Sequence, residues 1–120
     1  MKMIASYKVD KKDRKRLTTH ALLRYSQRFA PTLSIVETTR KCRNDLDRAY
    51  ILDYEEVKNY LKKVDRQNFE KCHIYKEKVF LEKDNVIITT VTATQFFDDK
   101  YIEDLKKIVP KEQMPILGLI

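Results

Sequence analysis

The chain is almost without glycine: Gly118, close to the C-terminal end, is the one glycine among 120 residues. Loops that cradle phosphate groups need glycines where their backbone amides approach the anion. The sequence therefore excludes Walker-type nucleotide sites and dinucleotide-binding folds. Any phosphate group that binds this protein must be held by side chains.

Cysteine is also scarce. Cys42 and Cys72 are far apart, and no pair among the cysteines and histidines has the short spacing of a zinc site. Neither lies in a local signature of a thiol nucleophile. The sequence predicts no metal and no cofactor. With two cysteines and no secretion-signal pattern, it favours the reducing cytoplasm.

Long apolar runs are missing as well, since none approaches the roughly 18 residues that a membrane span needs. The length of 120 residues suits one domain. Hydrophobic residues make up 42% and charged residues 36%, a balance typical of soluble globular proteins. We therefore expect a single domain over residues 1–120, away from membranes, as a monomer or a homodimer.

Positive charge is in excess, with 25 Lys and Arg against 18 Asp and Glu, a formal charge of +7. Such an excess favours RNA or another nucleic acid as a partner through counterion release, although many basic surfaces are merely solvated. The densest stretch, KVDKKDRKR at 8–16, predicts an exposed basic lead-in over residues 1–16. Its candidate contacts to a nucleic-acid backbone are Lys11, Lys12, Arg14, Lys15 and Arg16.

Capping residues and apolar spacing predict helices in the first half of the chain. The expected spans are one helix capped by Thr18 or Thr19 and ended by Pro31, a second over Ser34 to Ile51, and a third from Tyr54 to about Val64 behind Asp53.

From Phe69 onward the pattern changes to short segments rich in β-branched and aromatic residues. These predict a three-stranded antiparallel meander of Cys72 to Tyr75, Val79 to Glu82 and Val86 to Ala93, with the last, most apolar strand at its centre. The turns fall at 76–78 and 83–85, where Asp and Asn take the backbone angles that glycine usually takes.

A final helix is expected from about Lys100 to Val109, capped by Asp98 or Asp99 and closed by Pro110. The apolar tail at 114–120 can dock on the core, on a partner or on a second copy. The predicted fold class is α+β, with N-terminal helices packed on a small antiparallel meander and a C-terminal helix.

The stretch HALLRYSQRF at 20–29 is the most informative part of the sequence. In a helix, His20, Arg24 and Arg28 fall at about 0°, 40° and 80° and share one edge, while Leu22 and Phe29 lie on the opposite, packing arc. A proton-transfer group beside two cations is what phosphodiester cleavage requires. The same spacing is also typical of any amphipathic surface helix with basic residues.

The strand that contains Thr90 is a candidate for the other side of such a site, because the Thr90 hydroxyl could bind a phosphate group or orient the base. Threonine is also common in strands for its β-branching alone. His73, in the first predicted strand, is a second titrating group or a half-buried strand residue with a satisfied nitrogen.

The H-x-x-x-R-x-x-x-R helix of His20, Arg24 and Arg28, followed by further helix and a small meander that ends in Thr90-Val91, resembles small toxin-like domains. These domains are allied to the barnase, EndoU, colicin and RelE ribonuclease superfamily. The resemblance implies metal-independent RNA cleavage, with His20 in proton transfer and the arginines on the phosphate. A glycine usually follows the second arginine, whereas Phe29 stands here, and the segment from Pro31 to Asp53 is long for the pattern.

The sequence thus predicts a ribonuclease-like domain, of the toxin or phage-effector kind, that acts on RNA in the cytoplasm through His20, Arg24, Arg28 and Thr90. The alternative is a non-catalytic basic module that binds nucleic acid or a protein. Under either prediction a protein inhibitor or a host protein is a further possible partner.

Overall fold

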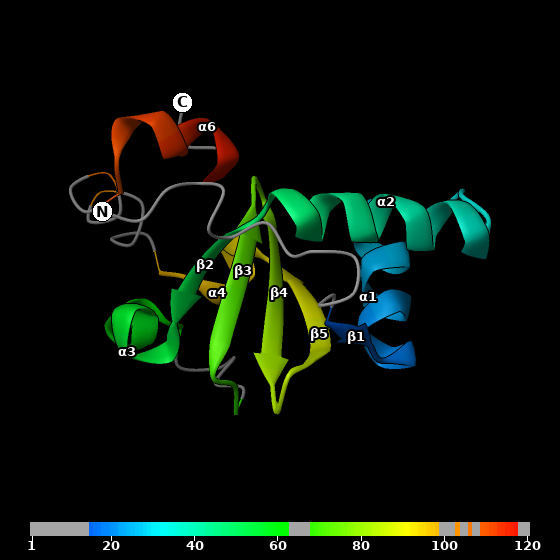
Figure 1. Ribbon diagram of the computed structural model, residues 1–120, viewed down its shortest axis with the longest axis horizontal. Coiled ribbons are helices and arrows are strands. Elements are labelled where there is room, and N and C mark those ends of the chain that lie inside the picture. The colour runs from blue at the N-terminus through cyan, green and yellow to red at the C-terminus, as the bar shows by residue number, and fades with distance from the viewer. Residues whose placement is uncertain (1–14, 63–67, 99–102, 104–105, 107–108, 118–120) are drawn as a thin grey trace.

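The computed structural model describes residues 15–62, 68–98, 103, 106 and 109–117. Its centre is a five-stranded mixed sheet in the order β1-β5-β4-β3-β2, with helices on both faces (Figure 1). The fold class is α+β, as predicted. The strands are β1 (Arg16–Leu17), β2 (Tyr50–Asp53), β3 (Lys71–Tyr75), β4 (Lys78–Lys83) and β5 (Val86–Thr92).

The N-terminal helices are α1 (Thr19–Phe29) and α2 (Ile35–Arg48). The Thr18 hydroxyl accepts a hydrogen bond from the Ala21 amide, 3.0 Å away, and so caps α1 as predicted. Ser34 caps α2 in the same way. The prediction that α2 reaches Ile51 is wrong, because the chain from Tyr50 onward forms β2 and pairs with β3.

The third helix is shorter than predicted. Asp53 and Glu56 form a capping box at the start of α3 (Tyr54–Val57), and the 3₁₀ helix η3 (Lys58–Tyr60) continues it. The helical backbone ends there because Leu61 is extended and bridges to Phe97. Val64, the predicted end, lies outside the described residues.

The meander of β3, β4 and β5 is antiparallel, as predicted. Lys76, Asp84 and Asn85 have φ values of 55°, 52° and 67°, so polar residues take the left-handed positions of both turns. β4 is the central strand and β5 is not, because β1 joins the outer side of β5 and β2 joins β3. Both added strands were absent from the sequence prediction.

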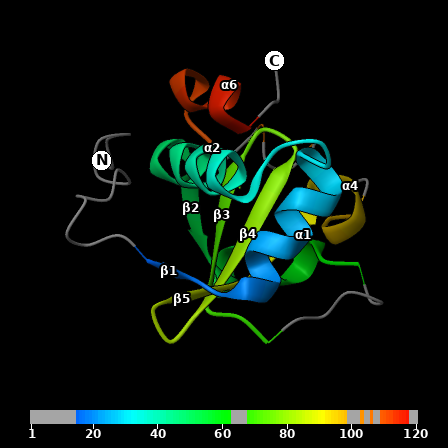
Figure 2. The ribbon, with the colours of Figure 1, turned by 90° about the vertical axis from the view of Figure 1, so that its right-hand side faces the viewer.

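The sheet has a packed layer on each face. α1 and α2 cover one face, where α1 lies against β5 (Figure 2). This layer is built on Ala21, Tyr25, Ala30, Cys42, Leu46, Phe80 and Ile87. The other face carries the larger core cluster, to which α3, α4 (Ala93–Phe96) and α6 (Met114–Leu117) contribute.

The described part of the apolar tail docks on that larger cluster, where the Leu117 side chain is buried. Glu103 and Lys106 are helical, and the rest of the predicted helix up to Ile108 lies outside the described residues. Within the described ranges, no helix combines the length and the apolar character that crossing a bilayer requires.

Candidate functional site: the outer edge of α1

Helix α1 is held to the sheet by two buried residues, Ala21 and Tyr25. At about 100° per residue Ala21 and Tyr25 fall at about 100° and 140° from His20, so the three candidate residues lie beside the packed side of the helix. His20 and Arg28 are exposed there, and Arg24 is half-buried. The structure therefore brings the three predicted residues onto one accessible edge, which we call the α1 edge (His20, Arg24 and Arg28).

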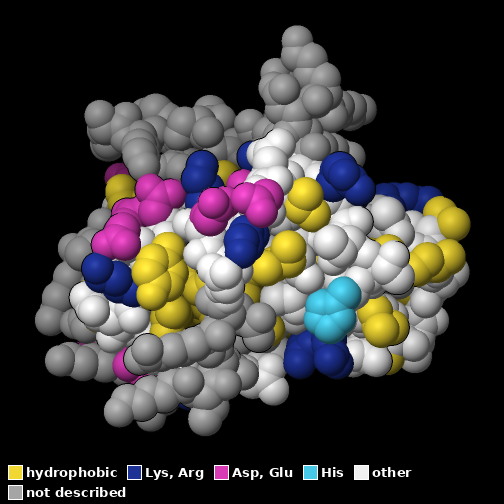
Figure 3. Space-filling view, turned by 90° about the horizontal axis from the view of Figure 1, so that it is seen from below, with side chains coloured by type: hydrophobic (Ala, Val, Ile, Leu, Met, Phe, Trp, Pro, Cys, Tyr) yellow, Lys and Arg dark blue, Asp and Glu magenta, His cyan; other side chains and the backbone are white. Residues whose placement is uncertain are grey.

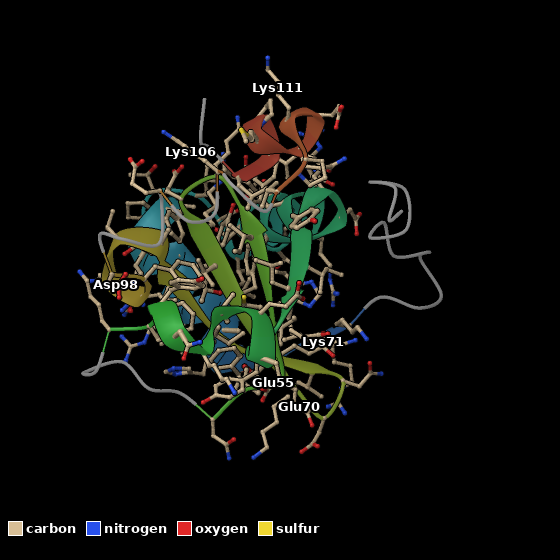
Figure 4. All side chains as sticks on the ribbon, turned by 90° about the vertical axis from the view of Figure 1, so that its left-hand side faces the viewer. Glu55, Glu70, Lys71, Asp98, Lys106 and Lys111 are labelled. Atoms are coloured by element: carbon tan, nitrogen blue, oxygen red, sulfur yellow. The ribbon has the colours of Figure 1, made fainter. Side chains whose placement is uncertain are left out.

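Charge is unevenly distributed around this edge. Figure 3 shows a histidine at the surface in the right half of the view with Lys or Arg side chains directly beside it, while the Asp and Glu side chains gather in the left half. The acidic side lies around α3: Glu55 is in its first turn, and Glu55 and Glu70 lie close together near the bottom of Figure 4. Glu55 is paired with Lys58 Nζ at 2.7 Å, so the α3 side carries both signs of charge, and the α1 side is the more favourable of the two for an approaching polyanion.

Each arginine makes a hydrogen bond to another of the described residues. Arg24 Nη1 donates to Gln27 Oε1 at 3.1 Å, and Arg28 Nη1 donates to the Thr90 carbonyl oxygen at 3.3 Å. A guanidinium has five N–H donors, so each side chain is positioned and still keeps donors for a phosphate group. Arg28 in particular is fixed against β5.

Thr90 does not share the accessible edge. Its side chain is 0% exposed, and its hydroxyl donates to the Ala21 carbonyl oxygen at 3.0 Å. Thr18 makes a parallel contact, since its hydroxyl donates to the Ile88 carbonyl oxygen at 3.3 Å. These threonines fasten α1 to β5, and Thr90 is therefore removed from the candidate catalytic set.

The basic lead-in is described only at its end. Lys11, Lys12 and Arg14 lie outside the described residues. Lys15 is not a free cation, because its ammonium donates to Asn85 Oδ1 and lies 3.5 Å from the Glu82 carboxylate. Arg16 is exposed but belongs to β1.

The prediction of an exposed lead-in is thus wrong for Lys15, which is half-buried, whereas Arg16 is exposed as predicted although it forms part of a strand. Arg16 pairs with Val86 in the parallel β1–β5 ladder. Arg43 Nη1 donates to the Lys15 carbonyl oxygen at 2.6 Å. These backbone contacts order the end of the segment, and charge density alone did not reveal them.

His73, the second histidine, is buried. It is 1% exposed, and its Nε2 lies 2.7 Å from Glu82 Oε1. Burial raises the pKa of Glu82, but the hydrogen bond and charge of His73, with the charges of Lys15 and Lys71, outweigh burial and leave that pKa below its usual value. His73 is therefore held inside the protein by its contact with Glu82 and does not meet solvent.

A second interior polar cluster joins α1, α2 and β4. Asp45 Oδ2 accepts from the Tyr25 hydroxyl at 2.5 Å and from Lys78 Nζ at 2.7 Å. Burial, followed by the hydrogen bond to Asp45, raises the pKa of Tyr25, so the phenol stays a protonated donor. The Lys78 ammonium also lies 5.6 Å from the centre of the Tyr25 ring.

Sequence reasoning missed both interior clusters. The available signal was the alternation Lys78, Phe80, Glu82 in β4, which puts two charged residues on the same face as a large aromatic residue. That face lies beneath the α1–α2 layer, so the charges had to find partners inside the protein.

The cysteines have no role at this site. Both are buried thiols. Burial, followed by the charge of Asp45, raises the pKa of Cys42 to about 12, and burial also raises that of Cys72. Over the described ranges, no three His, Cys, Asp or Glu side chains are grouped so that they could hold a metal ion.

Comparisons with protein-family models, with curated proteins and with solved structures found no match to this chain.

Proposed function

We propose that the protein cleaves RNA at the α1 edge without a metal ion. One observation carries the proposal: of the two histidines in the chain, His73 is buried in contact with Glu82, whereas His20 is exposed on the same edge as Arg24 and Arg28. His20 is thus the histidine that a substrate can reach, and two cations accompany it.

The proposed reaction is transesterification within the RNA. His20, as the neutral imidazole, takes the proton of a ribose 2′-hydroxyl, and the 2′-oxygen forms a bond to the adjacent phosphorus. The bond from phosphorus to the 5′-oxygen breaks, which leaves a 2′,3′-cyclic phosphate. The imidazolium or water returns a proton to the departing oxygen. Arg24 and Arg28 offset the negative charge that develops on the phosphoryl oxygens.

This chemistry needs the ribose 2′-hydroxyl as the nucleophile. DNA lacks that group, so it should bind to the α1 edge without being cut. An RNA strand with one 2′-deoxy position should likewise be spared at that position.

The burial of Thr90 supports a second candidate function, a non-catalytic RNA-binding module. Because its hydroxyl is committed to Ala21, the α1 edge loses the side chain that was expected to bind a phosphate group or orient the base, and His20 remains without that support. A binding surface needs only the cations, so charge reversal at Arg24 or Arg28 would then matter more than loss of His20.

The deciding experiment incubates purified protein with labelled RNA in excess chelator. His20→Ala should lower the cleavage rate by about 10²–10⁴-fold, the range typical of a lost acid–base group. Lys111→Ala, which removes an exposed cation outside α1, is the matched control and should cleave normally. Undiminished cleavage by His20→Ala overturns the proposal. No cleavage by the wild type, together with salt-sensitive RNA retention that Arg24→Glu weakens, supports the binding module.

A further inference from the structure

The first turn of α2, with Leu33 just before it, forms an apolar surface that the described part of the chain leaves uncovered. Leu33 is 37% exposed, and Ile35 and Val36 are each 65% exposed. We call these three residues the α2 tip. In Figure 1 this end of α2 projects to the right, past the strands and past α1.

The helical phase of Ile35 explains why its exposure is unusual. Thr38, Cys42 and Leu46, three, seven and eleven residues further on, are all buried beneath α2. Ile35 continues the same stripe and would be expected to pack inward. It stays exposed because this end of the helix extends beyond the sheet and α1. The buried side of α2 thus continues into its first turn, where the described residues do not pack against it.

The charges around the α2 tip are mainly positive. Arg40 and Lys41 are exposed on the next turn of α2. The acidic residue close by, Glu37, accepts a hydrogen bond from the Ser34 hydroxyl at 3.0 Å, so it is engaged at the helix cap. An apolar surface beside exposed cations fits a ligand that has both apolar and acidic side chains.

We propose that the α2 tip is the docking site for an acidic protein segment, which packs apolar side chains on Ile35 and Val36 and places carboxylates against Arg40 and Lys41. A second copy of this chain would bring two formal charges of +7 together, so electrostatic repulsion opposes that occupant. A nucleic acid would satisfy the cations but would leave the apolar side chains in water. The proposal is independent of RNA cleavage at the α1 edge.

The test uses a synthetic amphipathic helical peptide with leucines along one face and glutamates elsewhere. Fluorescence anisotropy measures its affinity for the wild type and for the Ile35→Ser/Val36→Ser protein. We expect about tenfold weaker binding to the variant, because half or more of the apolar contact is removed. Arg40→Glu should also weaken binding. Leu23→Ser changes an exposed apolar residue of α1 and should bind as the wild type does.

Control peptides separate the apolar and the electrostatic contributions. A peptide with glutamine in place of glutamate and a peptide with serine in place of leucine should each bind more weakly.

Equal affinity for the wild type and the double variant overturns the proposal, as does no binding at all. Sedimentation equilibrium that shows wild-type dimers and monomeric double variant replaces it with self-association. RNA retention that the double variant loses assigns the surface to nucleic acid instead. Because both substituted residues are exposed, thermal unfolding should be unchanged, and RNA cleavage should persist in the double variant.

Discussion

His73 of β3 and Glu82 of β4 are bonded although they are not opposite each other. The register pairs His73 with Phe80 and Glu82 with Lys71, so the 2.7 Å contact between Nε2 and Oε1 runs diagonally across the two strands. Lys15, just before β1, approaches the same carboxylate at 3.5 Å. One buried acid therefore connects the central strands to the N-terminal part of the fold.

This contact predicts acid sensitivity. The folded pKa of Glu82 is lowered, so its contribution to stability is complete above the unfolded pKa of about 4.3 and is lost as pH falls through the folded value. Urea unfolding at a series of pH values should show this loss. Glu82→Gln should lower the free energy of unfolding by about 1–3 kcal/mol at neutral pH. The free energy of unfolding of this variant should also fall less steeply as the pH becomes acidic.

Glu112→Gln is the control, because Glu112 is exposed; its unfolding free energy should fall with acid as that of the wild type does. If Glu82→Gln and the wild type lost the same free energy of unfolding on acidification, Glu82 would not be the source of the acid sensitivity.

The Asp45 cluster predicts a hierarchy of stability losses. Asp45→Asn leaves the Lys78 ammonium buried without its counter-charge and should lower the free energy of unfolding by about 3–5 kcal/mol. Tyr25→Phe removes one hydrogen bond and should cost about 1–3 kcal/mol. Chemical denaturation measures both values. Asp45→Leu combined with Lys78→Met should cost less than Asp45→Asn alone, and a greater loss in the double variant would refute the electrostatic explanation.

Thr90 offers a test that separates structure from catalysis. Thr90→Val keeps the shape of the side chain and removes the hydrogen bond to the Ala21 carbonyl, so it should lower stability by about 1–3 kcal/mol. The RNA cleavage rate at a temperature where the variant is folded should be unchanged. Thr90→Ser, which keeps the hydroxyl, is the matched control. A large loss of cleavage in the valine variant alone would return Thr90 to the active site.

The two thiols should react slowly in the native protein. Both are buried, and the raised pKa values disfavour the reactive thiolate. A chromogenic disulfide reagent at pH 8 should label the folded protein much more slowly than the protein in urea. Rapid labelling of the native state would show that α2 or β3 opens readily.

Local chemistry made the helix starts predictable. Thr18, Ser34 and Asp53 cap their helices through contacts within three residues, and such contacts are encoded in the adjacent sequence. The meander followed from alternation and from polar turn residues for the same reason. The α1 edge was also predictable, because helical spacing alone places its three residues together.

The features that sequence reasoning missed depend on contacts between distant segments. β1 is two residues long and exists because it pairs with β5, and β2 exists because it pairs with β3. The hydrogen bond from the Thr90 hydroxyl to the Ala21 carbonyl oxygen joins residues that are 69 positions apart in the sequence. No local pattern specifies such partners, so the extra strands, the buried polar clusters and the loss of Thr90 from the site could be seen only in the three-dimensional structure.

The parallel pairing of β1 with β5 also constrains the order of folding. Arg16 and Leu17 find their partners at Val86 and Ile87, so during synthesis the first helix leaves the ribosome long before the strand on which it packs. The meander, whose pairings are close in sequence, can form by itself, whereas docking of α1 requires closure of a long loop. We expect that docking to be the late step of folding, and a nascent chain that stops before β5 to expose the apolar side of α1 to chaperones.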